Sequence, residues 1–351
     1  MEDNKRSELS ELGEFGLIRH LTKDISLKNK SSILGVGDDA AMINNGDKMT
    51  LVSTDLLVEG VHFDLTYTPL KHLGYKAAVV NFSDIYAMNG NPEQITVGLA
   101  VSNRFSLEAI NEIYDGMKMA CERYGVDMVG GDTTSSLSGL FISITVIGSV
   151  ENDDVIYRNT ANENDLICVS GDLGGAYMGL LVLEREKQVF KANPDMQPSL
   201  EGLGYILERQ LKPEARQDIR KVLKGIKVKP TSMIDLSDGL ASDIMHICEG
   251  SKLGCKIYTN KLPIDPVTIS VAAEFQIDPN TAVMNGGEDY ELLFTIKPAD
   301  YEKVKDLSGI SVIGHMTDQG SGMNLLTPDG LSVELKALGW DALKKRSSGT
   351  S

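Results

Sequence analysis

The sequence is short of the residues that build redox, zinc or disulfide sites. Only 4 of its 351 residues are cysteines, and none forms a CxxC pair: Cys121, Cys168, Cys248 and Cys255. Zinc sites and disulfide frameworks depend on characteristic cysteine spacings, so both are disfavoured. Because cysteine is among the most buried residue types, we interpret all four as core positions.

Long apolar runs are also missing. No stretch of about 18 apolar residues, the length of a membrane-spanning helix, occurs in the chain. The N-terminal segment MEDNKRSELSELGEFGLI is charged and lacks the apolar stretch of a signal peptide. These absences predict a soluble, cytoplasmic protein without a membrane partner.

Basic residues are outnumbered by acidic ones. The chain has 34 lysines and arginines against 50 aspartates and glutamates, and its formal net charge is −16. Nucleic-acid binding depends on cations that neutralise phosphates, so this balance argues against a nucleic-acid partner. The sequence also lacks a GxxxxGK[ST] loop and the HRD and DFG motifs of protein kinases. The common nucleotide-binding folds are therefore disfavoured.

The pattern of apolar residues predicts an α/β protein. Strands are expected where apolar residues alternate or run together, and helices where they repeat every three to four residues. Ser106 precedes one helical pattern as a suitable N-cap. The expected strands are 50–54, 95–101, 141–150, 166–170, 232–235 and 290–296, the expected helices are 71–88, 106–124, 213–224 and 240–250, and a hairpin is expected over 323–335.

Two domains are expected in a chain of this length. A polar stretch, 151–165, separates the first group of strands and helices from the second. We therefore predict an N-terminal domain over residues 1–152 and a C-terminal domain over 153–343. The small and polar residues 344–351 predict a flexible tail.

Aspartates recur beside glycine and serine, at the expected ends of strands and helices. Each aspartate alone has an ordinary interpretation as a turn or helix-cap residue. Six such clusters in one chain indicate more than turns and helix caps, because converging carboxylates repel one another unless cations neutralise them. Mg²⁺ is commonly held by carboxylates together with substrate phosphates, so the clusters predict a metal-bridged phosphate site. They are 35–41 (GVGDDAA), 53–55 (STD), 81–84 (NFSD), 130–133 (GGDT), 235–239 (DLSDG) and 286–290 (GGEDY).

The cluster at 235–239 is the most suggestive. Asp235 and Asp238 lie three apart at an expected strand-to-helix turn, where both carboxylates could face one ion. Ser237 between them could offer a hydroxyl or an amide to a phosphate.

Three further features have an ordinary interpretation beside a functional one. His62 follows Asp55 closely enough to reach the same site. The glycine-rich turn 171–175 could approach a phosphate or could simply be a turn. Arg158 could pair with a phosphate or could be an exposed cation.

The six clusters, in this order, resemble the signature motifs of the thiamine-monophosphate kinases. The matching segments are GVGDDAA (35–41), STDLLVEGVHF (53–63), NFSDIYAMNG (81–90), GGDTT (130–134), DLSDGLASD (235–243) and GGEDYELLF (286–294). This family belongs to a superfamily with aminoimidazole ribonucleotide synthetase, selenophosphate synthetase and a hydrogenase maturation factor. The resemblance implies a two-domain α/β fold with mixed sheets packed by helices. It also implies a homodimer whose N-terminal sheets form a barrel, with ATP near the dimer interface.

The resemblance implies roles for individual residues as well. ATP contacts are expected from Tyr114, Gly131, Asp132, Arg158 and Ser237. Contacts to thiamine monophosphate are expected from His62, Glu288 and Trp340, the last through its aromatic face. Metal ligands are expected at Asp38, Ser53, Thr54, Asp55, Asp84, Asp132, Asp235 and Asp238. The segment 159–165 departs from the family pattern, since it lacks a glycine before its aspartate.

The implied activity is ATP-dependent phosphorylation of thiamine monophosphate to thiamine diphosphate, with several Mg²⁺ ions bridging the phosphates. No residue is expected to act as a covalent nucleophile or general base, because the acceptor phosphate is already ionised. A sibling ATP-dependent synthetase of the superfamily is one alternative. A non-catalytic acidic Mg²⁺ or Ca²⁺ module is another, although the aspartate spacing does not fit an EF-hand loop.

Overall fold

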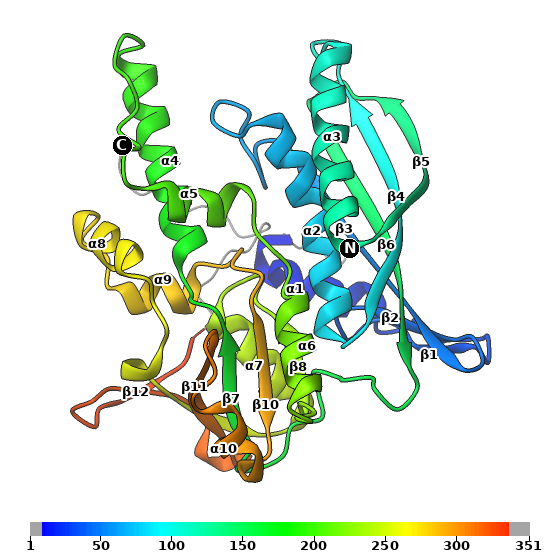
Figure 1. Ribbon diagram of the computed structural model, residues 1–351, viewed down its shortest axis with the longest axis vertical. Helices are drawn as coiled ribbons and strands as arrows, with labels where there is room; N and C mark the ends of the chain where they lie inside the picture. The colour runs from blue at the N-terminus through cyan, green and yellow to red at the C-terminus, as the bar shows by residue number, and fades with distance from the viewer. Residues whose placement is uncertain (1–8, 337–351) are drawn as a thin grey trace, which may run out of the picture.

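Two β-sheets, each packed by helices, make up the protein in the computed structural model, which describes residues 9–336 (Figure 1). The first sheet has six strands in the order β1-β2-β3-β6-β4-β5, and the second has seven in the order β13-β12-β9-β11-β7-β10-β8. Both sheets are mixed, since β4 pairs with β5, and β12 with β9, in parallel. The predicted α/β class with two mixed sheets is confirmed.

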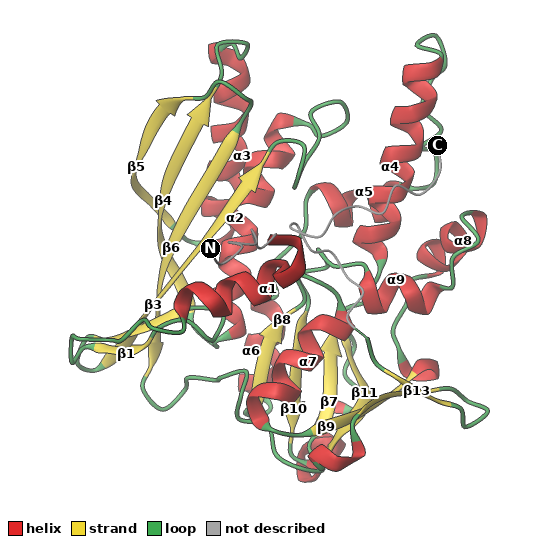
Figure 2. Ribbon diagram, turned by 180° about the vertical axis from the view of Figure 1, so that it is seen from behind, coloured by secondary structure: helices red, strands yellow, loops and turns green. Residues whose placement is uncertain are grey.

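The first sheet and its helices come from the N-terminal half of the chain. In β6, Ile142, Ile144 and Val146 are buried while the residues between them are half-exposed. Because burial alternates with a period of two residues, one face of the sheet points toward α2 and α3. Figure 2 shows both helices on that side. The elements are α1 (Leu9–Thr22), β1 (Ser32–Leu34), β2 (Ala41–Asn44), β3 (Lys48–Val58), α2 (Leu70–Ala87), β4 (Asn91–Val101), α3 (Leu107–Tyr124), β5 (Asp127–Ser135) and β6 (Phe141–Glu151).

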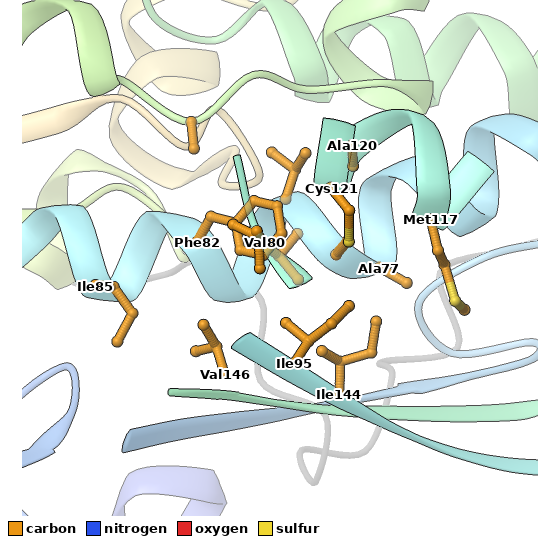
Figure 3. Packing of buried hydrophobic residues seen from close by; sticks show 14 of the residues in the cluster. Ala77, Val80, Phe82, Ile85, Ile95, Met117, Ala120, Cys121, Ile144 and Val146 are labelled. Atoms are coloured by element: carbon orange, nitrogen blue, oxygen red, sulfur yellow. The ribbon is translucent and has the colours of Figure 1, made fainter. Parts of the chain in front are cut away.

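Helix α2 is the centre of the first core. Its Phe82 and Ile85 lie above the strands, while Met117 and Cys121 reach toward it from α3 (Figure 3). A helix covered on both sides can be apolar nearly all round, which explains the continuous apolar run of its sequence.

Two glycines let α2 and α3 approach closely. A Cβ on Gly74 would lie 1.8 Å from the Ile113 carbonyl oxygen, and one on Gly116 would lie 1.9 Å from that of Lys71. No side chain fits at either position without moving a helix.

The second sheet and its helices come from the C-terminal half. All residues of β8 and β10 are buried, because helices cover both faces of these strands. Leu293 packs with Ile244 of α7 on one face, and Phe294 packs with Ile219 of α6 on the other. The elements are β7 (Leu166–Ser170), α4 (Gly175–Ala192), α5 (Gly204–Leu211), α6 (Gln217–Gly225), β8 (Ser232–Asp235), α7 (Leu240–Ser251), β9 (Gly254–Tyr258), α8 (Pro266–Glu274), α9 (Pro279–Asn285), β10 (Leu292–Ile296), α10 (Tyr301–Val304), β11 (Ile310–Thr317), β12 (Met323–Leu326) and β13 (Ser332–Glu334), with short 3-10 turns η1 (Thr259–Lys261), η2 (Pro298–Asp300) and η3 (Gln319–Ser321).

The expected strands and the hairpin are present, and Ser106 caps α3 through a hydrogen bond of 3.2 Å from the Ala109 N–H to Ser106 Oγ. The helix expected over 213–224 begins only at Gln217. Tertiary hydrogen bonds hold the preceding segment instead: Glu214 accepts from Tyr75 Oη, and the Ala215 N–H donates to Tyr124 Oη.

The expected position of the aspartates at element ends is wrong for three of them. Asp55 lies inside β3, Asp84 inside α2 and Asp132 inside β5. Strand β5 was itself not expected, because its glycines and polar residues give no apolar pattern.

The predicted domain boundary falls in the link 152–165 between the two sheets, and the division into two domains stays a prediction. The predicted tail, 344–351, lies outside the described residues. Among residues 9–336, no helix has both the length and the hydropathy needed to cross a membrane.

Candidate active site

A cavity of about 840 Å³ is lined by both halves of the chain. Strand β3 and helix α2 line it from the first half, and α4, the turn after β8 and the segment 285–290 line it from the second. Seven of the predicted site residues lie along it: Asp55, His62, Asp84, Asp235, Ser237, Asp238 and Glu288. Segments far apart in the sequence therefore meet in one place.

Two carboxylates meet where β3 passes α2. Ser53 and Asp55 share one face of β3, because side chains alternate along a strand. Ser53 Oγ donates to Asp84 Oδ2 at 2.6 Å. The Asp55 N–H donates to Asn81 Oδ1 at 3.1 Å. These bonds fix Asp55 and Asp84 beside each other.

The loop between β1 and β2 adds Asp38 and Asp39. The Asp39 N–H donates to Asp38 Oδ1 at 3.0 Å, and the Arg158 N–H donates to Asp38 Oδ2 at 3.3 Å. Arg158 Nε donates to the Gly37 carbonyl at 2.9 Å, and its Nη1 lies 3.8 Å from Asp39 Oδ1. Arg158 thus holds this loop and brings a cation beside its two acids.

The turn between β8 and α7 completes the acidic end of the cavity. Asp235 ends β8 with 4% of its surface exposed. Gly239 then turns the chain with φ of 107°, a conformation that favours glycine. The Asp238 N–H donates to Asp243 Oδ2 at 3.3 Å in the first turn of α7. Ser237 lies between the two aspartates that face the cavity.

These carboxylates are in an environment that opposes their charge. Burial raises the pKa of Asp38, Asp55 and Asp235 to about 6 in each case. Burial and neighbouring carboxylates raise the pKa of Asp39 and Asp84 well above the usual range. Asp39 Oδ2 and Asp235 Oδ2 are buried and accept no hydrogen bond from the described residues. A bound cation would neutralise the carboxylate charges and would give the buried oxygens a partner.

The acids fit Mg²⁺ by charge and by ligand type. Within residues 9–336, no group of three or more histidine, cysteine, aspartate or glutamate side chains is arranged so that it could hold a metal ion by itself. Mg²⁺, however, commonly takes one or two protein carboxylates and fills its remaining positions with water and substrate phosphates. The cluster is therefore suited to hold Mg²⁺ together with a phosphorylated ligand.

His62 and Glu288 line another part of the cavity. His62 Nδ1 accepts the Val58 N–H at 3.0 Å, and burial lowers the pKa of the imidazole. Glu288 Oε2 accepts from Lys76 Nζ at 3.0 Å and from Gln210 Nε2 at 2.7 Å.

The backbone around Glu288 is strained. Gly287, Glu288 and Tyr290 have φ of 68°, 60° and 51°. Such values are costly for residues other than glycine and persist where surrounding contacts enforce them. The fold therefore holds the Glu288 side chain at the cavity even though the backbone conformation there is unfavourable for a residue other than glycine.

One face of α2 connects the two parts of the cavity. Lys76, Val80 and Asp84 all line it, and they repeat every four residues. The same helix thus carries the partner of Glu288 and a member of the acidic cluster.

The remaining predicted residues are not brought to the cavity. Thr54 lies on the opposite face of β3 from Asp55, beside Thr145, whose Oγ1 donates to Thr54 Oγ1 at 3.1 Å. Asp132 lies on that same outer face of the sheet, because its row continues through Gly98 and Ser143 to Leu56.

Three more predicted residues also lie elsewhere. Gly131 is exposed on β5, and Tyr114 of α3 packs against the first core. Trp340 lies outside the described residues. The roles expected of these residues stay predictions.

Four residues of the site were not expected from the sequence. Asp39 and Asp243 stand inside motifs GVGDDAA and DLSDGLASD, so the motifs themselves were a sufficient signal. Lys76 is the one cation between Gly74 and Met88 of an apolar helical run, which marks it as a buried charge with a partner. Gln210 has no such signal, since only the tertiary structure places it beside Glu288.

Comparison with known proteins gives consistent matches. Residues 37–150 match the family model of the AIR synthase related protein, N-terminal domain. The thiamine-monophosphate kinase of Bacillus subtilis is 32% identical over 95% of this chain and 100% of its own length. That of Escherichia coli K12 is 32% identical over 94% of this chain and 98% of its own length.

Solved structures of related proteins are similar to this chain as well. A structure of AaThiL complexed with AMPPCP and TMP has a TM-score of 0.81 and 32% identity, and the match covers 96% of this chain and 99% of that one. The thiamine monophosphate kinase of Aquifex aeolicus has a TM-score of 0.74 and 29% identity, over 93% and 100% of the two chains. The hydrogenase maturation protein HypE of E. coli, at 17% identity and a TM-score of 0.64 over 84% and 88%, shares the fold.

Proposed function

This chain belongs to the thiamine-monophosphate kinase family, and we propose that its cavity holds thiamine monophosphate beside the phosphates of ATP for direct transfer of the γ-phosphoryl group. The enzyme is an ATP-dependent kinase that phosphorylates thiamine monophosphate to thiamine diphosphate. One observation supports the proposed site: Asp55, Asp84 and Asp235, from three separate motifs, line one cavity. Asp39 of a fourth motif lies close enough to Asp235 for the two charges to interact, and one carboxylate oxygen of each of these two residues is buried without a partner among the described residues.

We expect Mg²⁺ to be held by Asp39, Asp55, Asp84 and Asp235, together with the predicted ligands Asp38 and Asp238. Mg²⁺ bound there would neutralise phosphate charge and orient the reacting phosphates. Ser237 lies between two of these aspartates and lines the cavity, and we expect it to donate to a phosphate oxygen.

No covalent enzyme intermediate is expected. The four cysteines are buried, and His62 Nδ1 already accepts the Val58 N–H. The acceptor phosphate needs no base, since it is ionised at neutral pH. After incubation with γ-labelled ATP alone, the denatured enzyme should therefore carry no label, whereas stoichiometric label would exclude direct transfer.

A homodimer accounts for the residues that the cavity leaves out. Asp132 and Thr54 lie on the open face of the first sheet, and β5 is an edge strand of nine residues without a neighbour on its outer side among the described residues. Long exposed edges are uncommon in proteins that remain monomeric. We expect a second copy to cover this face and to bring Asp132 toward ATP. A cytoplasmic location stays a prediction from the sequence.

The test of function is the product. Purified enzyme with ATP and Mg²⁺ should form ADP and thiamine diphosphate in equal amounts, only when thiamine monophosphate is present, and excess chelator should abolish both. ATP hydrolysis that is independent of thiamine monophosphate, or no turnover at any Mg²⁺ concentration, would refute the proposal.

A further inference from the structure

One part of the cavity wall is formed by two segments that belong to different halves of the chain. Residues 59–69, between β3 and α2, line it from the first half, and one face of α4 lines it from the second. Helix residues three or four positions apart share a face, and the α4 residues on the cavity follow this spacing. They are Tyr177, Leu180, Leu181, Glu184 and Lys187.

Lys187 joins the two segments. Its Nζ lies 2.8 Å from Asp64 Oδ2 of the segment 59–69, and it donates at 3.0 Å to both carboxylate oxygens of Glu184 on its own helix. Only 13% of the Lys187 side chain is exposed, so its ammonium group depends on these partners in place of water. One cation therefore holds two carboxylates, one from each half of the chain.

Tyr67 makes a second link between the same segments. Its Oη donates to Glu184 Oε1 at 2.8 Å, and Lys187 Nζ lies 5.7 Å from the centre of its ring, within the range of a cation–π interaction. Burial opposes the ionisation of Asp64, but hydrogen bonds from Lys187 and Thr66 lower its pKa to about 2, so the ion pair is charged at neutral pH. We refer to Asp64, Tyr67, Glu184 and Lys187 together as the latch.

The segment 59–69 also carries His62 to the cavity. Hydrogen bonds of the backbone shape this segment: the Gly60 N–H donates to the Phe63 carbonyl at 2.8 Å, and the His62 N–H donates to the Val58 carbonyl at 2.9 Å. These bonds stay within the first half of the chain. The latch crosses to the second half, so it determines where His62 lies relative to α4.

We propose that the latch holds the segment 59–69 against α4 and so fixes the cavity at the width that thiamine monophosphate requires, with Lys187 as its positioning residue. Without Lys187, the carboxylates of Asp64 and Glu184 would face each other with no cation between them. Their repulsion would move the segment away from α4. This inference rests on the proposed function, since the latch is argued to support the binding of thiamine monophosphate.

The first measurement follows the segment without any substrate. Hydrogen exchange of the amides in residues 59–69 should become about tenfold or more faster in Lys187→Met, because loss of the latch lets the segment open locally. Exchange in β6 should stay the same, which separates local opening from general loss of stability. Lys191→Met removes an exposed lysine one turn further along α4 and is the matched control, with unchanged exchange expected.

The second measurement is kinetic. Lys187→Met should raise the KM for thiamine monophosphate about tenfold or more, because the segment carries His62, an expected contact of this substrate. The KM for ATP should stay within about twofold of the wild-type value. Lys187→Arg should keep most of the affinity for thiamine monophosphate. Adding Glu184→Gln to Lys187→Met should restore part of it, since this change removes the repulsion between the two carboxylates.

The outcomes separate the possible failures. Unchanged exchange of residues 59–69 in Lys187→Met would overturn the latch. Faster exchange with an unchanged KM, or an equal rise in the KM of both substrates, would refute its positioning role. If Lys187→Met does not fold, Tyr67→Phe removes only the hydroxyl link to Glu184 and should show the same pattern at about threefold. If the wild type does not turn over thiamine monophosphate, the proposed function fails, while the exchange measurement still decides whether the latch exists.

Discussion

Asp84 is the residue at which function and stability are most opposed. Asp84→Asn keeps the side-chain size and removes the charge. As a metal ligand, the Asp84 carboxylate should contribute about 3 to 5 kcal/mol to transition-state stabilisation, so turnover of the variant should fall by roughly 100-fold to several thousand-fold. Turnover of ATP with thiamine monophosphate at saturating Mg²⁺ is the measurement.

The same substitution should stabilise the metal-free protein. Burial and the charges of Asp55 and Asp235 raise the pKa of Asp84, so its ionised form is unfavourable in the fold. The melting temperature in chelator should rise by roughly 2 to 4 °C for each kcal/mol of repulsion relieved. Nearly unchanged turnover would remove Asp84 from the metal cluster.

His62 should make stability depend on pH. Burial lowers its pKa below 6.5, so the fold favours the neutral imidazole that accepts the Val58 N–H. Its contribution is present above about pH 6.5 and is lost as the pH falls below that value. The difference in unfolding free energy between wild type and His62→Gln should therefore shrink between about pH 8 and pH 5.5. His20→Gln, at an exposed histidine, serves as the control. A constant difference would show that His62 does not titrate as its burial requires.

Among the elements, the α2–α3 pair has no room for an added methyl group where the two helices touch. Gly116→Ala places a methyl group 1.9 Å from the Lys71 carbonyl oxygen, so the helices must separate. Overpacking of this kind costs about 1 to 3 kcal/mol, more than the helix propensity that alanine gains. Denaturant unfolding should show this loss. Gly225→Ala, where no atom lies within 4 Å, should be neutral or slightly stabilising; equal effects of the two changes would contradict close packing.

Elements with a continuous apolar run or a clear apolar period were predictable, and those formed by pairing were not. The runs that became α2, β6 and β10 carry their own signal. Strand β5 exists because β4 offers it a partner, and no local pattern announces that. The motifs likewise identified Asp55 and Asp84 as members of one site. They could not show that Thr54 points the other way, since the strand boundaries decide which residues share a face.

At the scale of the whole molecule, the open face of the first sheet is the main expectation to test. Val52 and Ile147 are paired on this face and only half-buried, although both are apolar. If a second copy covers them, Ile147→Glu should place a charge in the interface and give a single chain at low micromolar concentration in sedimentation. Leu107→Glu, at an exposed leucine of α3, should leave the dimer unchanged. Identical sedimentation of both variants would exclude this face.

The shared face of α2 has a consequence for changes of chain length. Lys76 and Asp84 are eight residues apart, and a helix rises 1.5 Å per residue, so about 12 Å separates the two positions. One rigid helix therefore fixes the spacing between the partner of Glu288 and the acidic cluster. Insertion of a single residue between them would turn one position by about 100° relative to the other, so that both could no longer face the cavity.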